Sequence, residues 1–342
     1  MYFYPSGMVI VSDLCCRQLI NMNKLYMSSF GGYLGMEFSK GREYHDQLLR
    51  LNTGRNALEY ILRVNKYSLV YVPYYSCDAL LEPIQKLGLK HVFYNINEHL
   101  DPAAEIKVKE GECLLYVNYF GIKDDTVAKL SRESRDVIID NSQSFFSRPV
   151  ANASTFYSCR KFFGVPDGAY LQTDASERIT LPQDTSYDSC THLLKYYDAG
   201  IEPGYKDFLR NEVRLTGADM KHMSFLSQAI MSSIDYSSCK QRREENFQYL
   251  HSKLAKINEL NLNFSSATAA LNYPLLVSNP ELRGLLIKEK IFIPDFWPNV
   301  RKWMTKENYE YFLSENLVAL PVDQRYNKED MDSIIETIFK LT

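Results

Sequence analysis

"VIIDNSQSF" (Val137–Phe145), followed closely by "STFYSCRKFFGVPDGAY" (Ser154–Tyr170), is the part of the sequence that decides the fold. The first stretch opens with an apolar run ending in a carboxylate, Asp140, which is typical of a strand buried on both faces. The second holds Lys161 beside two phenylalanines, with Ser158 three residues before it. Ligands of a helix-covered parallel sheet bind at the carboxyl ends of its strands, and Asp140 is predicted to lie at such an end.

Outward from these stretches, the chain alternates between segments of helical and of strand character. Helices are expected where apolar residues recur with a spacing of three and four, and strands where short runs are β-branched and aromatic. The expected helices are 52–64, 78–88 with a bend at Pro83, and 124–134. The expected strands are 68–73, 91–96, a strand and turn within 113–121, 136–140 and 168–173. This alternation predicts an α/β protein with a mostly parallel sheet.

A length of 342 residues favours two domains over one. We expect an N-terminal arm or part of a minor domain at 1–45, a large α/β domain at 46–225 and a small α+β domain at 226–342. One long helix at 225–257 would cross from the large domain into the small one, and a helix from Lys328 would close the chain.

The composition excludes several classes of protein. The net charge is −3, with 45% hydrophobic and 24% charged residues, so we expect a soluble globular protein without a nucleic-acid partner. No stretch reaches the roughly 20 apolar residues that span a membrane, so no membrane partner is expected. The seven cysteines include no CxxC pair and the six histidines have no metal-ligand spacing. These features predict reduced thiols, a cytoplasmic location and no metal site.

Four local features are candidates for a binding site, and each has a simpler explanation when taken alone. Thr53 precedes a helix whose free N–H groups could bind a phosphate, but threonine is also an ordinary N-cap. Asp140, with Gln143 three residues later, could hold a ring nitrogen protonated or could cap the next turn. Lys161 could be a nucleophilic amine in a partly desolvated pocket or a surface lysine. Ser158 could contact a phosphate or be structural.

The order of these features resembles that of the DegT-type sugar aminotransferases, which are fold type I pyridoxal-phosphate enzymes. The similarity extends over most of the chain. The segments that carry it are "LNTGRNALEYIL" from Leu51, "IIDNSQSF" from Ile138, "YSCRKFFGVPDGAYL" from Tyr157, "QRREENFQYL" from Gln241 and "LVALPVDQRYNKEDM" from Leu317.

The resemblance implies a large domain that binds pyridoxal 5'-phosphate and a role for each matching residue. Lys161 would hold the cofactor aldehyde through its amine and would move the proton during transfer. Asp140 would pair with the pyridine nitrogen, and Gln143 would face the ring near its 3-oxygen. The residues implied in phosphate binding are Thr53, Gly54, Arg55 and Ser158.

The sequence departs from the family pattern at two places. Where the family has a bulky residue stacked on the ring, this chain has Ser76 and Cys77; Cys77 would line the ring, and Tyr74 or Tyr75 would stack on it, or Asn118–Tyr119 would cover it. The asparagine that many members donate to the partner subunit is displaced, with Asn211 or Glu212 near its place in a predicted loop at 204–217. We therefore expect a homodimer with shared active sites, in which Asn211 contacts the cofactor.

The resemblance implies an aminotransferase that moves an amino group from an amino acid, glutamate, to the keto group of a nucleotide-linked sugar. Its small-molecule partners would be this amino donor and this keto acceptor. A second hypothesis is a non-catalytic paralogue that acts by binding, motivated by the altered stacking and cross-subunit positions. A third, a nicotinamide-dependent enzyme, is disfavoured because no GxGxxG follows an early strand.

Overall fold

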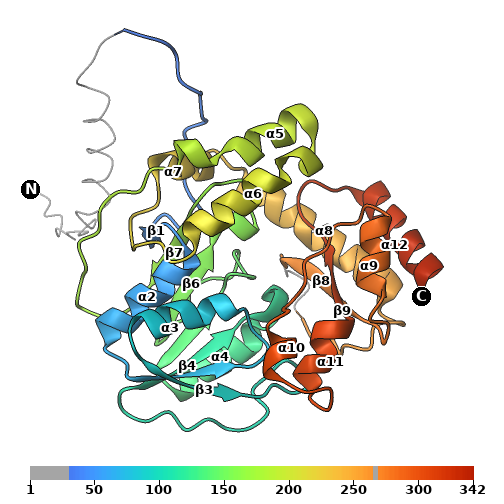
Figure 1. The fold of residues 1–342 in the computed structure, drawn as a ribbon, viewed down its shortest axis with the longest axis horizontal. Helices are drawn as coiled ribbons and strands as arrows, with labels where there is room; N and C mark the ends of the chain where they lie inside the picture. Colours follow the sequence, from blue (N-terminus) through green and yellow to red (C-terminus); the bar gives the residue numbers. More distant parts are fainter. Residues whose placement is uncertain (1–30, 265–268) are drawn as a thin grey trace, which may run out of the picture.

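The computed structural model describes residues 31–264 and 269–342, so most of the predicted N-terminal arm lies outside the described residues (Figure 1). Seven strands form one sheet in the order β1-β7-β6-β5-β4-β2-β3. Their bounds are β1 Leu49–Leu51, β2 Leu69–Pro73, β3 Lys90–Tyr94, β4 Glu112–Val117, β5 Val137–Asp140, β6 Ser154–Ser158 and β7 Ala169–Gln172.

The predicted parallel sheet is confirmed. Strands β3, β2, β4, β5 and β6 run parallel to one another, whereas β7 is antiparallel to both β6 and β1. The register sets Asp140 of β5 opposite Val117 of β4 and Phe156 of β6. The central strand β5 is buried along its whole length, as its apolar run predicts. The strands β1 and β6 were not among the expected elements.

Helices connect and cover the strands, as the alternation predicts. The start of α2 has the predicted N-cap, since Thr53 Oγ1 accepts a hydrogen bond from Asn56 N at 3.0 Å. Pro83 lies in the first turn of α3 and does not interrupt it, because the N–H groups of a first turn have no intrahelical acceptor. The α-helices of the large sheet's half are α2 Gly54–Asn65, α3 Leu81–Lys86, α4 Asp124–Glu133, α5 Thr191–Ala199, α6 Ile201–Leu215 and α7 Phe225–Ser232.

The C-terminal part of the chain forms a second, two-stranded antiparallel sheet of β8 (Asn272–Leu276) and β9 (Leu317–Pro321), with helices around it (Figure 1). These helices are α8 Tyr236–Leu254, α9 Leu282–Lys288, α10 Val300–Trp303, α11 Tyr309–Asn316 and α12 Lys328–Leu341. One cluster of buried apolar side chains continues from the large sheet into this smaller part. The division of the chain at residues 45 and 225 stays a prediction.

Two predicted elements are wrong. The single helix expected at 225–257 is two helices, α7 and α8, because Asp235 accepts a hydrogen bond from Ser238 N and starts a new helix. The loop expected at 204–217 is most of α6, which packs against α5 as a helical hairpin. Its polar residues at a spacing of three to four form a solvated helix face, which the sequence reading mistook for a loop.

Candidate active site

The carboxyl ends of four parallel strands meet at one edge of the sheet. The segments that leave this edge follow Pro73 of β2, Val117 of β4, Asp140 of β5 and Ser158 of β6. They carry Cys77, Gln143 and Lys161, which the sequence separates by up to 84 positions. The topology therefore brings the predicted residues to the place where α/β sheets bind ligands.

Lys161 and Asp140 are joined through a residue that the sequence reading missed. The Nζ atom of Lys161 donates a hydrogen bond to Ser142 Oγ at 2.9 Å, and Asp140 Oδ1 accepts one from Ser142 N at 2.8 Å. Burial raises the pKa of Asp140, and the nearby Lys161 cation and the hydrogen bonds from Ser142 oppose that rise. Ser142 lies inside the Asp-x-x-Gln motif, two residues after the aspartate. An aspartate side chain commonly accepts a hydrogen bond from the backbone N–H at this position of a turn.

Gln143 is fully buried and has one unused donor group. Its Oε1 accepts a hydrogen bond from Phe120 N at 2.6 Å, while its Nε2 has no partner within residues 31–264 and 269–342. The Phe120 turn lies this close because Gly121 follows it: a Cβ atom there would lie 2.8 Å from Gln143 O. A buried amide N–H without an acceptor is costly, so Nε2 is a natural donor for a bound ligand.

The start of α2 lies near the same edge. A Cβ atom on Gly54 would lie 3.8 Å from the Phe156 ring, which places this helix start beside β6. Burial raises the pKa of the Cys77 thiol, and the positive charges of Lys161 and Arg55 both oppose this rise. Both cationic side chains therefore lie within electrostatic range of the thiol. The side chain of Arg55 is paired with Glu82 at 3.0 Å. Its backbone N–H, in the first turn of α2, is one of the groups available for a phosphate.

Ser158 ends β6, one turn before Lys161. It pairs in register with Ala169, and its side chain makes no capping bond to the short helical turn Cys159–Lys161. The lysine turn returns to β7 through Gly168, which has a φ of +129° that side-chain-bearing residues rarely adopt. Lys161 as a whole residue is exposed in the single chain, although its amine is held against the buried Ser142 hydroxyl.

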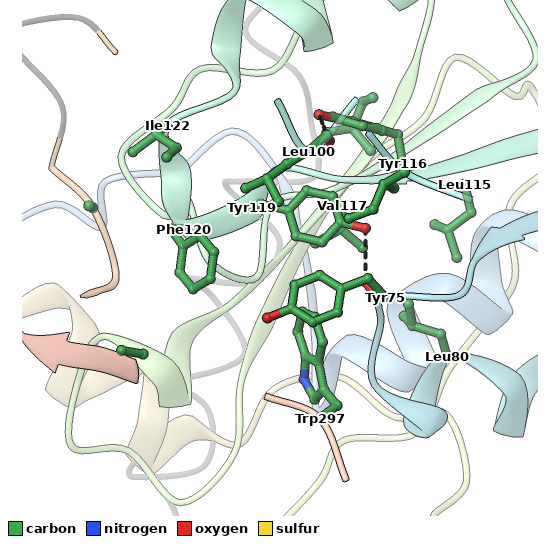
Figure 2. Packing of buried hydrophobic residues seen from close by; sticks show 14 of the residues in the cluster. Tyr75, Leu80, Leu100, Leu115, Tyr116, Val117, Tyr119, Phe120, Ile122 and Trp297 are labelled. Atoms are coloured by element: carbon green, nitrogen blue, oxygen red, sulfur yellow. Dashed lines mark hydrogen bonds between the residues drawn. The ribbon is translucent and has the colours of Figure 1, made fainter. Parts of the chain in front are cut away.

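Two predicted ligand residues have other roles. Tyr75 is fully buried, and its ring packs against Trp297 at 4.9 Å and beside Tyr119, whose hydroxyl donates to Tyr75 O (Figure 2). It is a core residue, because its aromatic ring fills the space between the two parts of the chain. Asn211 is buried in α6, with Nδ2 donating to Pro166 O and Oδ1 accepting from Arg214 Nε. Its amide is therefore used within its own chain.

Comparison with solved structures identifies the class of fold: this chain has the fold of the pyridoxal-phosphate-dependent aminotransferases. The apo-form of Spr1654, a candidate sugar aminotransferase from Streptococcus pneumoniae, matches with a TM-score of 0.61 and 18% identity over 98% of this chain and 96% of that one. DesV from S. venezuelae, solved with a ketimine intermediate, matches with a TM-score of 0.63 and 15% identity over 96% and 95%.

A DegT/DnrJ/EryC1/StrS aminotransferase from Brucella abortus matches with a TM-score of 0.56 and 14% identity over 86% of this chain and 85% of that one. The predicted resemblance to DegT-type enzymes is thus confirmed at the level of the fold. By sequence, neither a protein-family model nor a curated protein matches the chain.

Two further findings concern other kinds of site. In residues 31–264 and 269–342, no group of three or more histidine, cysteine, aspartate or glutamate side chains could hold a metal ion. Among the helices of the same residues, none combines the length and the apolar character that a membrane crossing requires.

Proposed function

We propose that this protein is a pyridoxal-phosphate-dependent aminotransferase that transfers an amino group from glutamate to the keto group of a nucleotide-linked sugar. The observation that carries the proposal is the Lys161–Ser142–Asp140 arrangement at the carboxyl edge of the sheet. The fold supports it, as do neighbours solved in forms with pyridoxal phosphate and pyridoxamine phosphate, including Spr1654. The nucleotide-sugar acceptor and the donor rest on the resemblance alone.

The residues present fit this cofactor. Gln143 Nε2 is a buried donor without an acceptor, which suits the 3-oxygen of the ring. The first N–H groups of α2, at Gly54 and Arg55, are free of intrahelical acceptors and suit a phosphate. The Ser158 hydroxyl would add to that phosphate site, and the Cys77 side chain would line the ring. When bound, the cofactor supplies an electron sink that stabilises a carbanion at the substrate carbon.

Each side chain has a definite task in the proposed reaction. The Lys161 amine, held by Ser142 Oγ, would take a proton from the substrate carbon and would then deliver it to the cofactor as the amino group is transferred. Asp140 holds a proton on the ring nitrogen, because a buried carboxylate without a counter-charge is unfavourable and a cationic partner relieves it. Thr53 holds the start of α2 in place through its N-cap bond.

Borohydride reduction tests the proposal directly. Purified protein incubated with pyridoxal phosphate should absorb in the visible region, and reduction should attach the cofactor to one peptide that contains Lys161. Attachment to another lysine would contradict the assignment. Attachment to Lys161 without transfer of an amino group from any amino acid to any keto sugar nucleotide would favour the non-catalytic paralogue.

We further propose that the enzyme is a homodimer with shared active sites and that it works in the cytoplasm. Lys161 is exposed in the single chain, and neither of two hollows, of about 340 and 370 Å³, includes it. The α5–α6 hairpin is anchored beside it, since Glu212 pairs with Arg160 and Asn211 binds Pro166 O. A second copy seated on the hairpin would cover the amine. The five cysteines of the described residues are free, which suits a reducing compartment.

A further inference from the structure

Arg243 is a buried cation that the proposed chemistry does not use. It lies in α8, is only 1% exposed, and is among the largest fully buried side chains of the described residues. Burial lowers its pKa to about 10, so it remains charged at neutral pH. Its hydrogen-bond acceptors are neutral oxygens, and its guanidinium lies over a phenyl ring. The Asp323 carboxylate attracts it electrostatically but is itself paired with Arg325, so Arg243 lacks a carboxylate of its own, although buried charges are normally paired. Such a residue calls for an explanation other than a simple ion pair.

The contacts of Arg243 converge on the residue after Lys161. Its Nη2 donates to Phe162 O at 3.4 Å, and its guanidinium lies over the Phe162 ring at 4.4 Å from the centroid. Gln324 completes the arrangement: Nε2 donates to Phe162 O at 3.0 Å, and Oε1 accepts from Arg243 Nε at 2.9 Å. Two side chains from the C-terminal part of the chain thus hold one carbonyl of the lysine turn.

The same guanidinium also reaches the other half of the site. Arg243 Nη1 donates to Ala270 O at 3.0 Å and to Leu271 O at 3.3 Å. Leu271 N in turn donates to Phe120 O at 3.0 Å, and Phe120 N donates to Gln143 Oε1 at 2.6 Å. Hydrogen bonds and the backbones of Leu271 and Phe120 therefore link the turn of Lys161, through Arg243, to the side chain of Gln143.

We propose that Arg243, with Gln324, is a positioning element that sets the Lys161 amine relative to Gln143 and couples both to the C-terminal part of the chain. The consequence for cofactor attachment rests on the proposed function, but the positioning of the lysine turn by Arg243 does not. Buried charge-assisted bonds suit this task because their directional donors allow one arrangement of the backbone oxygens. Displacing a reacting group by about 1 Å can cost on the order of 100-fold in rate, so a small loosening would be measurable.

Two variants separate positioning from general stability. Arg243→Met removes the donors and the charge with similar volume. Gln324→Glu keeps an acceptor for Arg243 Nε and so retains that contact, but it replaces the donor to Phe162 O with a carboxylate oxygen that repels the carbonyl. Asn258→Ala is the matched control, since Asn258 bonds Pro274 O and Leu276 N and makes no contact with the lysine turn.

The first measurement uses protein without cofactor: hydrogen exchange of the peptide that covers residues 159–168. Both test variants should raise exchange at Phe162 and Phe163, whose N–H groups bond Cys159 O, by at least about tenfold. The second measurement is the rate of borohydride-trapped attachment of pyridoxal phosphate to Lys161, which should fall by at least about tenfold in both. Asn258→Ala should lower the melting temperature and leave both readouts at the wild-type value.

The two proposals fail in different ways. Unchanged exchange and unchanged trapping in a folded Gln324→Glu variant would overturn the positioning role, even if Arg243→Met does not fold. If wild-type protein fails to bind pyridoxal phosphate, the proposed function is overturned, while the exchange measurement still decides whether Arg243 and Gln324 hold the lysine turn. Equal changes in Asn258→Ala and the test variants would reduce Arg243 to an ordinary structural residue.

Discussion

The carboxyl edge of the sheet and the α5–α6 hairpin differ in how far the single chain buries their side chains. At the edge, Asp140, Ser142 and Gln143 are all buried, and each makes at least one hydrogen bond within the chain. The hairpin region, in contrast, leaves nine large apolar side chains exposed to solvent. They are Tyr187, Leu194, Tyr196, Tyr197, Ile201, Tyr205, Phe208, Leu209 and Val213.

The difference separates a surface that the single chain completes from one that we propose a second copy covers. Exposed apolar patches of this kind mark interaction sites in soluble proteins. The hairpin is nevertheless firmly attached to the site, through the Arg160–Glu212 ion pair and the Asn211–Pro166 bond. Substitutions in the two regions should have separable effects, which decrease from the amine of Lys161 to the exposed face of α6.

Replacing the amine should abolish the reaction. Lys161→Ala should lower transamination by about 10⁴-fold, because the variant lacks both the covalent attachment and the acid–base group. Free pyridoxal phosphate should still bind weakly, since the proposed phosphate site at the start of α2 is separate from Lys161. Steady-state kinetics and cofactor titration measure both effects. Lys129→Ala, at an exposed lysine of α4, is the control and should behave as wild type; residual activity near wild type in Lys161→Ala would refute the role of the amine.

Replacing the Asp140 carboxylate should have the second-largest effect on turnover. Asp140→Asn should fold normally and lose about 100-fold or more in turnover, because a preorganised charge opposite the ring nitrogen is removed. Asp136→Asn is a matched control, because Asp136 precedes the same strand at its opposite end and accepts from Tyr67. Turnover and melting temperature should be measured for both variants. Wild-type turnover in Asp140→Asn would leave Asp140 as a structural cap.

The stability of the fold should depend on pH through His45, whose ring packs against Phe145 and Tyr157. Burial lowers its pKa to about 4, although Nε2 donates to Phe145 O at 2.7 Å. The unfolded chain takes up this proton near pH 6.5, so the contribution to stability is complete above that pH and is lost as pH falls toward 4. Between pH 7 and 5 the loss from this group should be about 2 kcal/mol.

Urea unfolding at both pH values measures that loss. His45→Gln, which cannot titrate, should show a pH 7-to-5 decrease smaller than wild type by about this amount. His99→Gln, at an exposed histidine, should keep the wild-type decrease. An identical pH response in wild type and His45→Gln would mean that His45 does not remain neutral in the fold.

Substitutions on the exposed face of the α5–α6 hairpin should have the smallest effect, a weaker dimer. Tyr205→Glu together with Val213→Lys places charges on the exposed face of α6 and should weaken dimerisation by at least about tenfold, because unpaired charges would have to be desolvated. Sedimentation at micromolar concentration measures this. Phe339→Glu, at an exposed apolar position of α12, should have no effect. A wild-type protein that is monomeric at these concentrations would remove the proposal of a shared site.

The sequence predicted the large sheet well because its signals are local. Apolar runs such as that of β5 and a helix start such as Thr53 depend on a few neighbouring residues, and the structure has both. The hairpin was mistaken for a loop because Gly204 and the scattered charges of α6 resemble turn chemistry. Gly204 is instead tolerated in the helix because it packs closely on α5, where a Cβ atom would lie 3.1 Å from His192 O.

The candidate site divides in the same way. The strand-end Asp140, the Gln143 three residues later and the Lys161 segment were proposed from the sequence because their order along the chain resembles that of the DegT-type enzymes. Tyr75 could not be assigned correctly, since only the packing of Trp297, 222 positions later, shows that its ring lies in the core. Ser142 was visible in the motif, but its link to Lys161 spans two strands.

By itself, the sequence determined an α/β fold with a parallel sheet and a lysine, an aspartate and a glutamine available at its carboxyl edge, because hydrophobic period and strand ends are written in contiguous residues. Only the tertiary structure decided that Asn211 serves its own chain, that Lys161 is exposed in the single chain, and that Arg243 reaches the lysine turn. These facts depend on contacts between residues far apart in the chain, whose geometry is set by packing and carries no local signature.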